Sequence, residues 1–277
     1  LVPEDRSLPQ HMTRVVHFLL HVPKCAGTTV EAHFRTHLRE RFLIAPRWES
    51  ILRNFVGNRY PDLTADALRD VRVVSGHSLS TDMRELFPGA EIRESVLLRD
   101  PTGFLLSFYN YRWTRFEEGW GPEPPTFERW YSVQRRNPIS RFLLNRYFGE
   151  AVPALYRLSS TQRLSYLEQC FSGFHFVGSY RQTDEMIGRI SRELGIPGEV
   201  ISHNVTPKRK LIAADLPVAL RQRIERENAL DQALFDRWGD RGWDGHIDAP
   251  RPDLPRADQL RYLVGDSVTG IAKKFIA

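Results

Sequence analysis

A short segment of small and polar residues near the start of the sequence could bind an anion. Residues 23–29 read PKCAGTT and follow an apolar run. Gly27, Thr28 and Thr29 can present backbone N–H and hydroxyl groups to an anion at the start of a helix, where the helix dipole contributes about 0.3–1 kcal/mol. Lys24 would add a full positive charge. The segment therefore predicts a site for a phosphate-like anion.

The order of residues in this segment argues against two common phosphate-binding loops. In nucleoside triphosphatases the loop reads G-x-x-x-x-G-K-[ST], and its Ser or Thr holds magnesium. Here Lys24 precedes Gly27, so a kinase using ATP would lack its metal ligand, and it is retained only as an alternative. A cysteine phosphatase built on Cys25 would need an arginine six residues later, but position 31 is a glutamate.

A second candidate anion-binding position follows a predicted strand at residues 95–98. Arg99 ends this run, and Ser107 stands eight residues later, two turns along the predicted helix and facing back toward the end of the strand. A guanidinium group can bind a phosphate group through two parallel hydrogen bonds, to which a serine hydroxyl adds one more. In isolation, an ion pair of Arg99 with Asp100 or another carboxylate at a loop edge would be the better explanation.

A histidine follows another predicted strand, at residues 71–75. His77 comes after Gly76 in the sequence VVSGHS. Imidazole titrates near neutral pH and can accept a proton from an attacking alcohol. A histidine in a loop is more often only a polar surface residue, so the neighbouring motifs decide its interpretation.

Strand and helix signals alternate along the chain, and they place these residues together. Near-continuous apolar runs are typical of strands buried on both faces of a parallel sheet. The alternation predicts an α/β fold with a central, mainly parallel sheet flanked by helices, and ligands at the carboxyl ends of the strands. We expect strands at 15–22, 71–75, 95–98 and 174–180, and helices at 27–41, 102–113, 127–136, 138–148, 160–171, 183–194 and 216–238, the last capped by Asp215.

Residues 21–29 and 96–109 resemble two signatures of the sulfotransferases that use 3′-phosphoadenosine 5′-phosphosulfate, most closely the carbohydrate O-sulfotransferases. The first matches their H-x-P-K-x-[GA]-G-T-T loop, and Arg99 and Ser107 match the spacing of the second. The resemblance implies a P-loop, nucleotide-kinase-like sulfotransferase fold, this nucleotide as the donor, adenosine 3′,5′-bisphosphate as the product, and no metal. It implies that the 5′-phosphosulfate contacts Lys24, Cys25, Ala26, Gly27, Thr28 and Thr29, and the 3′-phosphate Arg99 and Ser107.

The same resemblance implies catalytic roles. Lys24 would neutralise the phosphate oxygen that gains charge as the S–O bond breaks, which lowers the barrier. A Gly-His pair after the second strand supplies the base in glycan sulfotransferases, which implies that His77 deprotonates the acceptor hydroxyl. Some relatives use a glutamate, so Glu31 remains an alternative base. Arg112, Trp113 and Arg115 are weaker candidates for binding the acceptor, which we expect to be a carbohydrate or glycolipid.

Weaker matches extend the resemblance over roughly residues 15 to 240. FVGSYR at 176–181 resembles the F-x-G-x-x-[ER] strand end, and HNVTPKR at 203–209 resembles a late H-x-N-x-[ST]-x-x-R loop that closes over the nucleotide. These matches imply donor contacts from Tyr180, Lys208 and Arg209. The last helix matches N-x-x-D-x-x-L-[FY], which we interpret as packing.

Composition leaves a further alternative open. The 277-residue chain is 41% hydrophobic and 26% charged, which is typical of a globular protein, with a formal charge of +5. Only five of its 39 basic residues are lysines, so 34 are arginines. A non-catalytic module that binds anionic glycans or nucleic acid is therefore possible. The position of the candidate residues at strand ends favours a small-ligand pocket instead, and no nucleic-acid partner is expected.

We expect one sulfotransferase domain at 13–243, with an insertion or lid at about 113–138. Residues 1–12 are expected to be a flexible extension or left from expression, and 244–277 a tail packed on the core or on a partner.

No apolar run reaches the roughly 18 residues of a membrane helix. Two cysteines make no disulfide framework, which suits a reducing compartment. We expect a bacterial, cytoplasmic protein, with a lumenal fragment as the alternative. His33 and His37 have metal-ligand spacing without a third ligand, so no metal is expected; oligomeric state is open.

Overall fold

Five parallel strands form the centre of the molecule. The computed structural model describes residues 14–46, 63–148, 158–200 and 210–239. Its sheet has the order β2-β3-β1-β4-β5, with every neighbouring pair parallel, so the predicted α/β class with a parallel sheet is confirmed. The strands are β1 (Val15–Leu20), β2 (Phe42–Ile44), β3 (Val73–Gly76), β4 (Glu91–Leu98) and β5 (Phe176–Ser179).

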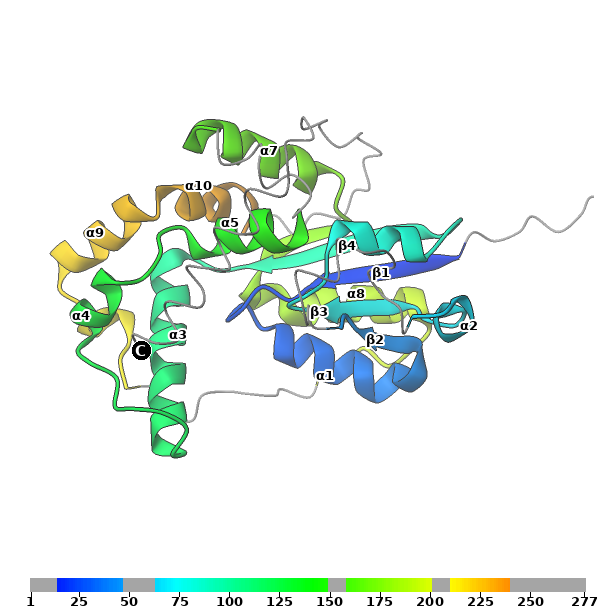
Figure 1. Ribbon diagram of the computed structural model, residues 1–277, viewed down its shortest axis with the longest axis horizontal. Coiled ribbons are helices and arrows are strands. Elements are labelled where there is room, and N and C mark those ends of the chain that lie inside the picture. The colour runs from blue at the N-terminus through cyan, green and yellow to red at the C-terminus, as the bar shows by residue number, and fades with distance from the viewer. Residues whose placement is uncertain (1–13, 47–62, 149–157, 201–209, 240–277) are drawn as a thin grey trace, which may run out of the picture.

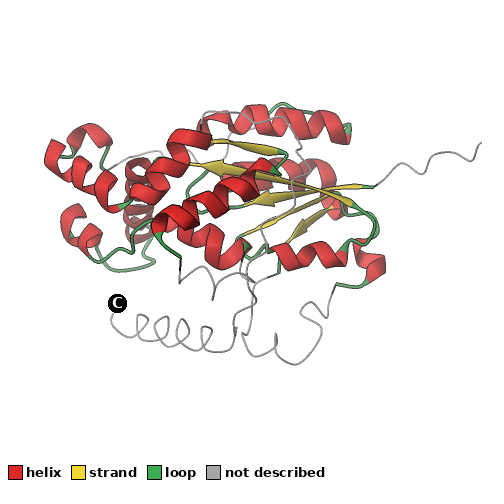
Figure 2. Ribbon diagram, turned by 90° about the horizontal axis from the view of Figure 1, so that it is seen from above, coloured by secondary structure: helices red, strands yellow, loops and turns green. Residues whose placement is uncertain are grey.

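Helices cover both faces of this sheet (Figures 1 and 2). α1 (Gly27–Leu38) and α8 (Thr183–Leu194) lie on one face, and α5 (Pro138–Phe142), the π-helical turn Leu143–Tyr147 and α10 (Ala229–Trp238) lie on the other. α7 (Ser160–Ser172) packs against α10. Because both faces are covered, β1 reads VVHFLL with five of its six residues buried.

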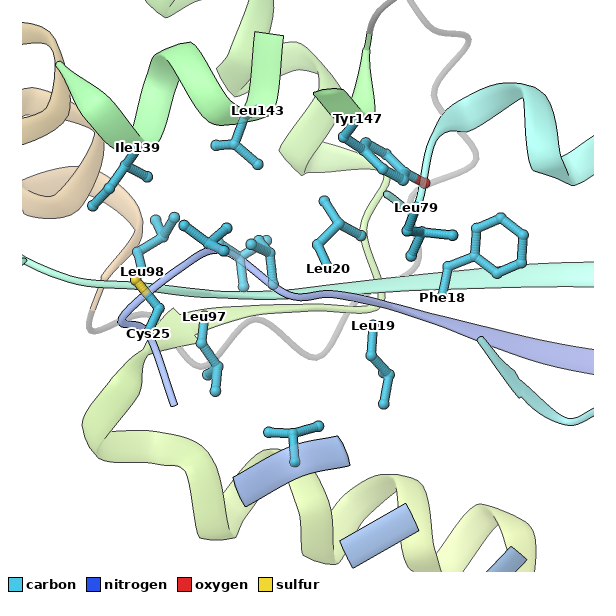
Figure 3. Close-up of a cluster of buried hydrophobic side chains, with 14 of the residues drawn as sticks. Phe18, Leu19, Leu20, Cys25, Leu79, Leu97, Leu98, Ile139, Leu143 and Tyr147 are labelled. Carbon is cyan, nitrogen blue, oxygen red and sulfur yellow. The ribbon is translucent and has the colours of Figure 1, made fainter. Parts of the chain in front are cut away.

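The hydrophobic core is continuous across the two faces of the sheet. In the close-up of Figure 3, Phe18 and Leu20 point toward Leu143, while Leu19 and Leu97 point to the opposite side, where α1 and α8 lie. This alternation along each strand is the period of two that a pleated strand requires. It fixes which face each polar residue of the strands can reach.

A helical extension stands at the carboxyl end of the sheet. α3 (Pro101–Glu117) is capped by Asp100, whose side chain accepts a hydrogen bond from the N–H of Gly103 at 2.6 Å, and Pro101 occupies the first turn of the helix. The helix runs away from the strands and packs beside α9 (Val218–Glu227) (Figure 1). α4 (Phe127–Ser132) follows α3 and buries Phe127, Trp130 and Tyr131.

The structure differs from the sequence prediction at β2, at Asn228 and at Asp215. β2 was not predicted: its three residues pair with β3 and extend the sheet by one strand. The long helix expected at 216–238 is broken at Asn228, whose side chain hydrogen-bonds Tyr131 and accepts from the N–H of Asn137. Asp215 was wrongly predicted as a cap, since it ends a short 3-10 turn (Ala213–Asp215) and α9 begins after Pro217.

Local signals mark the ends of two of the predicted helices. α8 ends at Gly195, which adopts the left-handed conformation (φ 65°) expected of a helix C-terminus. α7 begins with a capping box between Ser159 and Gln162. Within the residues described, no helix has the length and apolar character needed to cross a membrane. The predicted terminal segments 1–12 and 244–277 lie outside the described residues.

Candidate functional site

The turn between β1 and α1 holds its backbone in an unusual conformation. Lys24 (φ 63°) and Ala26 (φ 64°) are both left-handed although neither is glycine, and each such residue costs about 1–2 kcal/mol. Ala26 precedes α1 without a side chain that could cap it. The N–H groups of Gly27 and Thr28 at the start of the helix have no acceptor inside it, whereas the N–H of Thr29 donates to the backbone oxygen of Ala26 at 3.0 Å. Strain of this kind and uncapped donors are features of anion-binding turns.

Not every residue of the turn can contact a ligand through its side chain. The Cys25 side chain is buried and points into the core near Leu98 and Ile139 (Figure 3). Burial raises the pKa of its thiol far above the ordinary value, so the thiol stays protonated and inert. Only the backbone of Cys25 could therefore face an anion. Thr28 is exposed and Thr29 is half-buried at the start of α1.

The two predicted anion-binding motifs meet at the carboxyl end of the sheet. Arg99, which follows β4, donates a hydrogen bond from Nη1 to the backbone oxygen of Lys24 at 3.1 Å, across 75 positions of sequence. The Nζ of Lys24 lies 4.3 Å from the ring centre of Tyr111 on α3. Burial, and then the nearby charge of Arg99, lower the pKa of Lys24. Two cations are thus held together.

Arg99 is oriented by an aromatic ring rather than by a carboxylate. Its guanidinium carbon lies 4.2 Å from the ring centre of Tyr180, which follows β5. No ion pair within the described part of the chain involves Arg99, because Asp100 instead caps α3. Its Nε is buried without a hydrogen-bond partner among the described residues. Ser107 is half-buried on α3, about two turns further along.

His77 is held at the same end of the sheet by the loop that follows β1. Its Nδ1 lies 2.8 Å from the backbone oxygen of His21, and the two imidazole rings are 3.9 Å apart between centres. A carbonyl oxygen only accepts, so Nδ1 carries the proton and Nε2 keeps a lone pair. His77 is exposed, but partial burial of its ring, and then the charge of His21, lower its pKa, so the ring is neutral at pH 7.

Glu31 is connected to this pair of rings. Its Oε1 accepts a hydrogen bond from Nδ1 of His21 at 2.7 Å and lies 3.1 Å from the hydroxyl of Ser75. Burial alone would raise the pKa of Glu31, but these hydrogen bonds outweigh it and leave the pKa below its ordinary value. Gly27 makes the arrangement possible, because a Cβ at that position would lie only 1.9 Å from Cδ2 of His21.

His21 is the residue that the sequence motif contains but to which sequence analysis assigned no role. The signal was its place in H-x-P-K, two residues before Pro23. Its function as a bridge between Glu31 and His77 depends on contacts across ten and 56 positions of sequence. These contacts cannot be found from spacing alone.

The weaker candidates for binding the acceptor all stand on α3. Arg112 is exposed on α3, Arg115 stacks on Trp120 with 5.0 Å to the ring centre, and Trp113 is half-buried. All three stand on the half of α3 that leaves the sheet, which Figure 1 shows. Lys208 and Arg209 lie outside the described residues.

The group at the end of the sheet therefore combines two cations, uncapped helix N–H groups and a neutral histidine with an available lone pair. The two cations and the helix N–H groups can bind an anion with two charged ends, and His77, at the same end of the sheet, can accept a proton. Within the described residues, no metal ligand set occurs there. A comparison of the chain with known family models, with curated proteins and with solved structures found no match.

Proposed function

We propose that this chain is an O-sulfotransferase that moves a sulfuryl group from 3′-phosphoadenosine 5′-phosphosulfate to a hydroxyl of a carbohydrate or glycolipid. The observation that carries the proposal is the hydrogen bond from Arg99 to the backbone of Lys24 at 3.1 Å. A nucleotide phosphorylated at its 3′ and 5′ positions needs positive charge at two points of one pocket. These two motifs supply that charge side by side.

The turn after β1 suits the 5′ end of the donor. The N–H groups of Gly27 and Thr28 and the hydroxyl groups of Thr28 and Thr29 can bind phosphate oxygens. Lys24 provides a point charge for the oxygen that becomes more negative as sulfur leaves. Such a charge binds the transition state more tightly than the ground state. A sulfuryl group carries less charge than a terminal phosphate group, so no magnesium is required.

The residues around Arg99 suit the 3′-phosphate. Stacking on Tyr180 presets the plane of the guanidinium group, and the partnerless Nε is a donor that a phosphate oxygen could satisfy. Ser107 adds a hydroxyl from the next helix.

His77 is a better base than Glu31. The carboxylate of Glu31 already accepts hydrogen bonds from His21 and Ser75, and its lowered pKa weakens it as a proton acceptor. His77 is neutral, and its Nε2 remains available after Nδ1 donates to the backbone oxygen of His21. We assign proton acceptance to Nε2 of His77, and Glu31 positions His21 beneath it.

The strand order supports the nucleotide-kinase-like arrangement that the sequence resemblance implies. β1 lies between β3 and β4. The chain leaves β1 toward β2 on one side and leaves β4 toward β5 on the other. Ligands of open parallel sheets bind where the connections after two neighbouring strands leave in opposite directions. Lys24 follows β1 and Arg99 follows β4, so the proposed donor site lies at that point.

A thermal-shift panel on the full chain tests the proposal. Adenosine 3′,5′-bisphosphate without metal should raise the melting temperature, because a ligand at 100 times its Kd stabilises by about 2.7 kcal/mol. A shift only with ATP and magnesium would identify a kinase instead. A salt-sensitive shift only with heparin would identify a non-catalytic anion-binding module.

A further inference from the structure

A second group of ionisable side chains lies on the face of the sheet that α8 covers. His17 is on β1, His175 directly precedes β5, and Glu193 is in the last turn of α8. One ring nitrogen from each histidine and one carboxylate oxygen all lie within 4.8 Å of one another. α8 starts after β5 and runs back along the sheet. This group is therefore at the opposite end of the sheet from Lys24 and is independent of the proposed activity.

His17 is the member that most needs an explanation. Its ring is fully buried, and neither ring nitrogen has a hydrogen-bond partner among the described residues. The nearest polar contact is 3.5 Å, from Nε2 to Oε2 of Glu193. Burying a polar group without a partner is costly, and apolar residues occupy the neighbouring core positions of β1. Such a group needs an explanation, and an ion or water bound at the site is one.

The protonation states suit a metal ion. Burial lowers the pKa of His17 to about 3, so the ring is neutral at pH 7 and keeps a lone pair. Burial would raise the pKa of Glu193, but hydrogen bonds from His175 (2.8 Å) and Arg93 (2.7 Å) reduce it to about 2. Neutral imidazole and ionised carboxylate are the forms that bind metals.

The surrounding charges permit a cation but moderate its affinity. Arg93 donates to Glu193 and also, through Nε, to Glu91 at 2.7 Å. It can therefore hold the carboxylate in place as an outer-shell partner while Glu91 offsets its charge. Arg189 lies 3.8 Å from the other oxygen of Glu193 and opposes a cation. Glu193 is partly exposed, which leaves a path from solvent.

We propose that His17, His175 and Glu193 form a structural binding site for a divalent transition-metal ion, with Zn²⁺ as the best match. Two imidazole nitrogens and one carboxylate oxygen are a zinc donor set, and water can take the fourth position. Calcium and magnesium prefer oxygen ligands throughout. Metal binding would draw the three donor atoms closer together and join β1, α8 and the segment before β5.

Titration of the chelator-treated full chain tests this site. Isothermal calorimetry with Zn²⁺ should show one ion per chain, and Co²⁺ should give the visible absorption bands of a low-coordinate site. His175→Gln and Glu193→Gln should each weaken Zn²⁺ binding by at least the roughly 10–100-fold that loss of an outer-shell partner causes. His37→Gln, on α1, and Glu185→Gln, on α8, are matched controls that should bind as the parent does.

Each outcome decides the proposal. Absence of Zn²⁺ binding would overturn it, and so would unchanged affinity in His175→Gln and Glu193→Gln, which would locate the ion elsewhere. The Glu193 side chain is 25% exposed, so its variant is expected to fold even if His175→Gln does not, and far-ultraviolet circular dichroism checks this. Stabilisation by Zn²⁺ against urea should also disappear in Glu193→Gln.

Discussion

The replacement of Gly27 by Ala tests whether the His21 ring holds the candidate site together. A Cβ at this position would lie 1.9 Å from Cδ2 and 2.4 Å from Cγ of His21, so the ring must move by about 1.5 Å to reach ordinary contact. The ring is buried, with Glu31 bound to Nδ1 and His77 packed on it. Its movement therefore disrupts both contacts.

The expected loss of stability is the sum of two costs and one smaller gain. Overpacking costs about 1–3 kcal/mol, and the weakened charge-assisted hydrogen bond to Glu31 costs about 1.5–3 kcal/mol. Higher helix propensity returns at most about 1 kcal/mol. We expect Gly27→Ala to lower the free energy of unfolding by about 2–4 kcal/mol in urea denaturation, and sulfuryl transfer should fall further than the folded fraction does.

Gly188→Ala is the matched control. Gly188 lies within α8, and an added Cβ there meets no atom within 4 Å. The same substitution should therefore stabilise the chain by about 0.5–1 kcal/mol. If Gly27→Ala were as stable as the parent, or more stable, the packing of His21 on Gly27 would not matter and the reasoning would be refuted.

Three further outcomes are expected. His77→Ala should lose most turnover while binding of adenosine 3′,5′-bisphosphate is unchanged; full turnover would exclude His77 as the base. In the parent, kcat/KM should rise with pH around a pKa below the ordinary 6.5, because His77 acts when neutral, and fall around a pKa below 10.5, because Lys24 acts when charged. His77→Ala should lose the acid limb, and a parent acid limb above pH 7 would contradict the assignment. Asp231→Ala should cost about 2–4 kcal/mol in urea denaturation, since the buried carboxylate accepts from two backbone N–H groups of α5 at 2.8 Å each. Asp236→Ala, exposed on the same helix, should change stability by less than about 0.5 kcal/mol, and equal losses would contradict the capping role.

Sequence patterns were sufficient for the elements whose signals are local. Buried strands such as β1 are near-continuous apolar runs, and α8 has an amphipathic pattern that ends at glycine. β2 has only three residues, and it is a strand because β3 offers it an unpaired edge. The break at Asn228 depends on partners 91 and 97 positions away. Neither feature has a local signal.

The candidate site likewise contains some residues that have a local sequence signal and others that have none. Lys24, His77 and Arg99 could be selected because each follows a predicted strand, and parallel strands bring those ends together. The role of His21 could not be predicted, because it depends on the absence of a Cβ at Gly27 and on the carboxylate of Glu31, one helix turn later. Likewise, His17 and His175 are ordinary strand residues in sequence, and only the return of α8 brings Glu193 to them.

The central claim is that one bisphosphorylated adenosine spans the turn at Lys24 and the guanidinium group of Arg99. Calorimetry with adenosine 3′,5′-bisphosphate and with adenosine 5′-phosphate tests it most directly. The parent should prefer the bisphosphate by about 100-fold, since a charged bidentate contact contributes about 3 kcal/mol. Arg99→Ala should abolish that preference, while Arg35→Ala, exposed on α1, should keep it. Equal affinity of the parent for the two nucleotides would contradict the account.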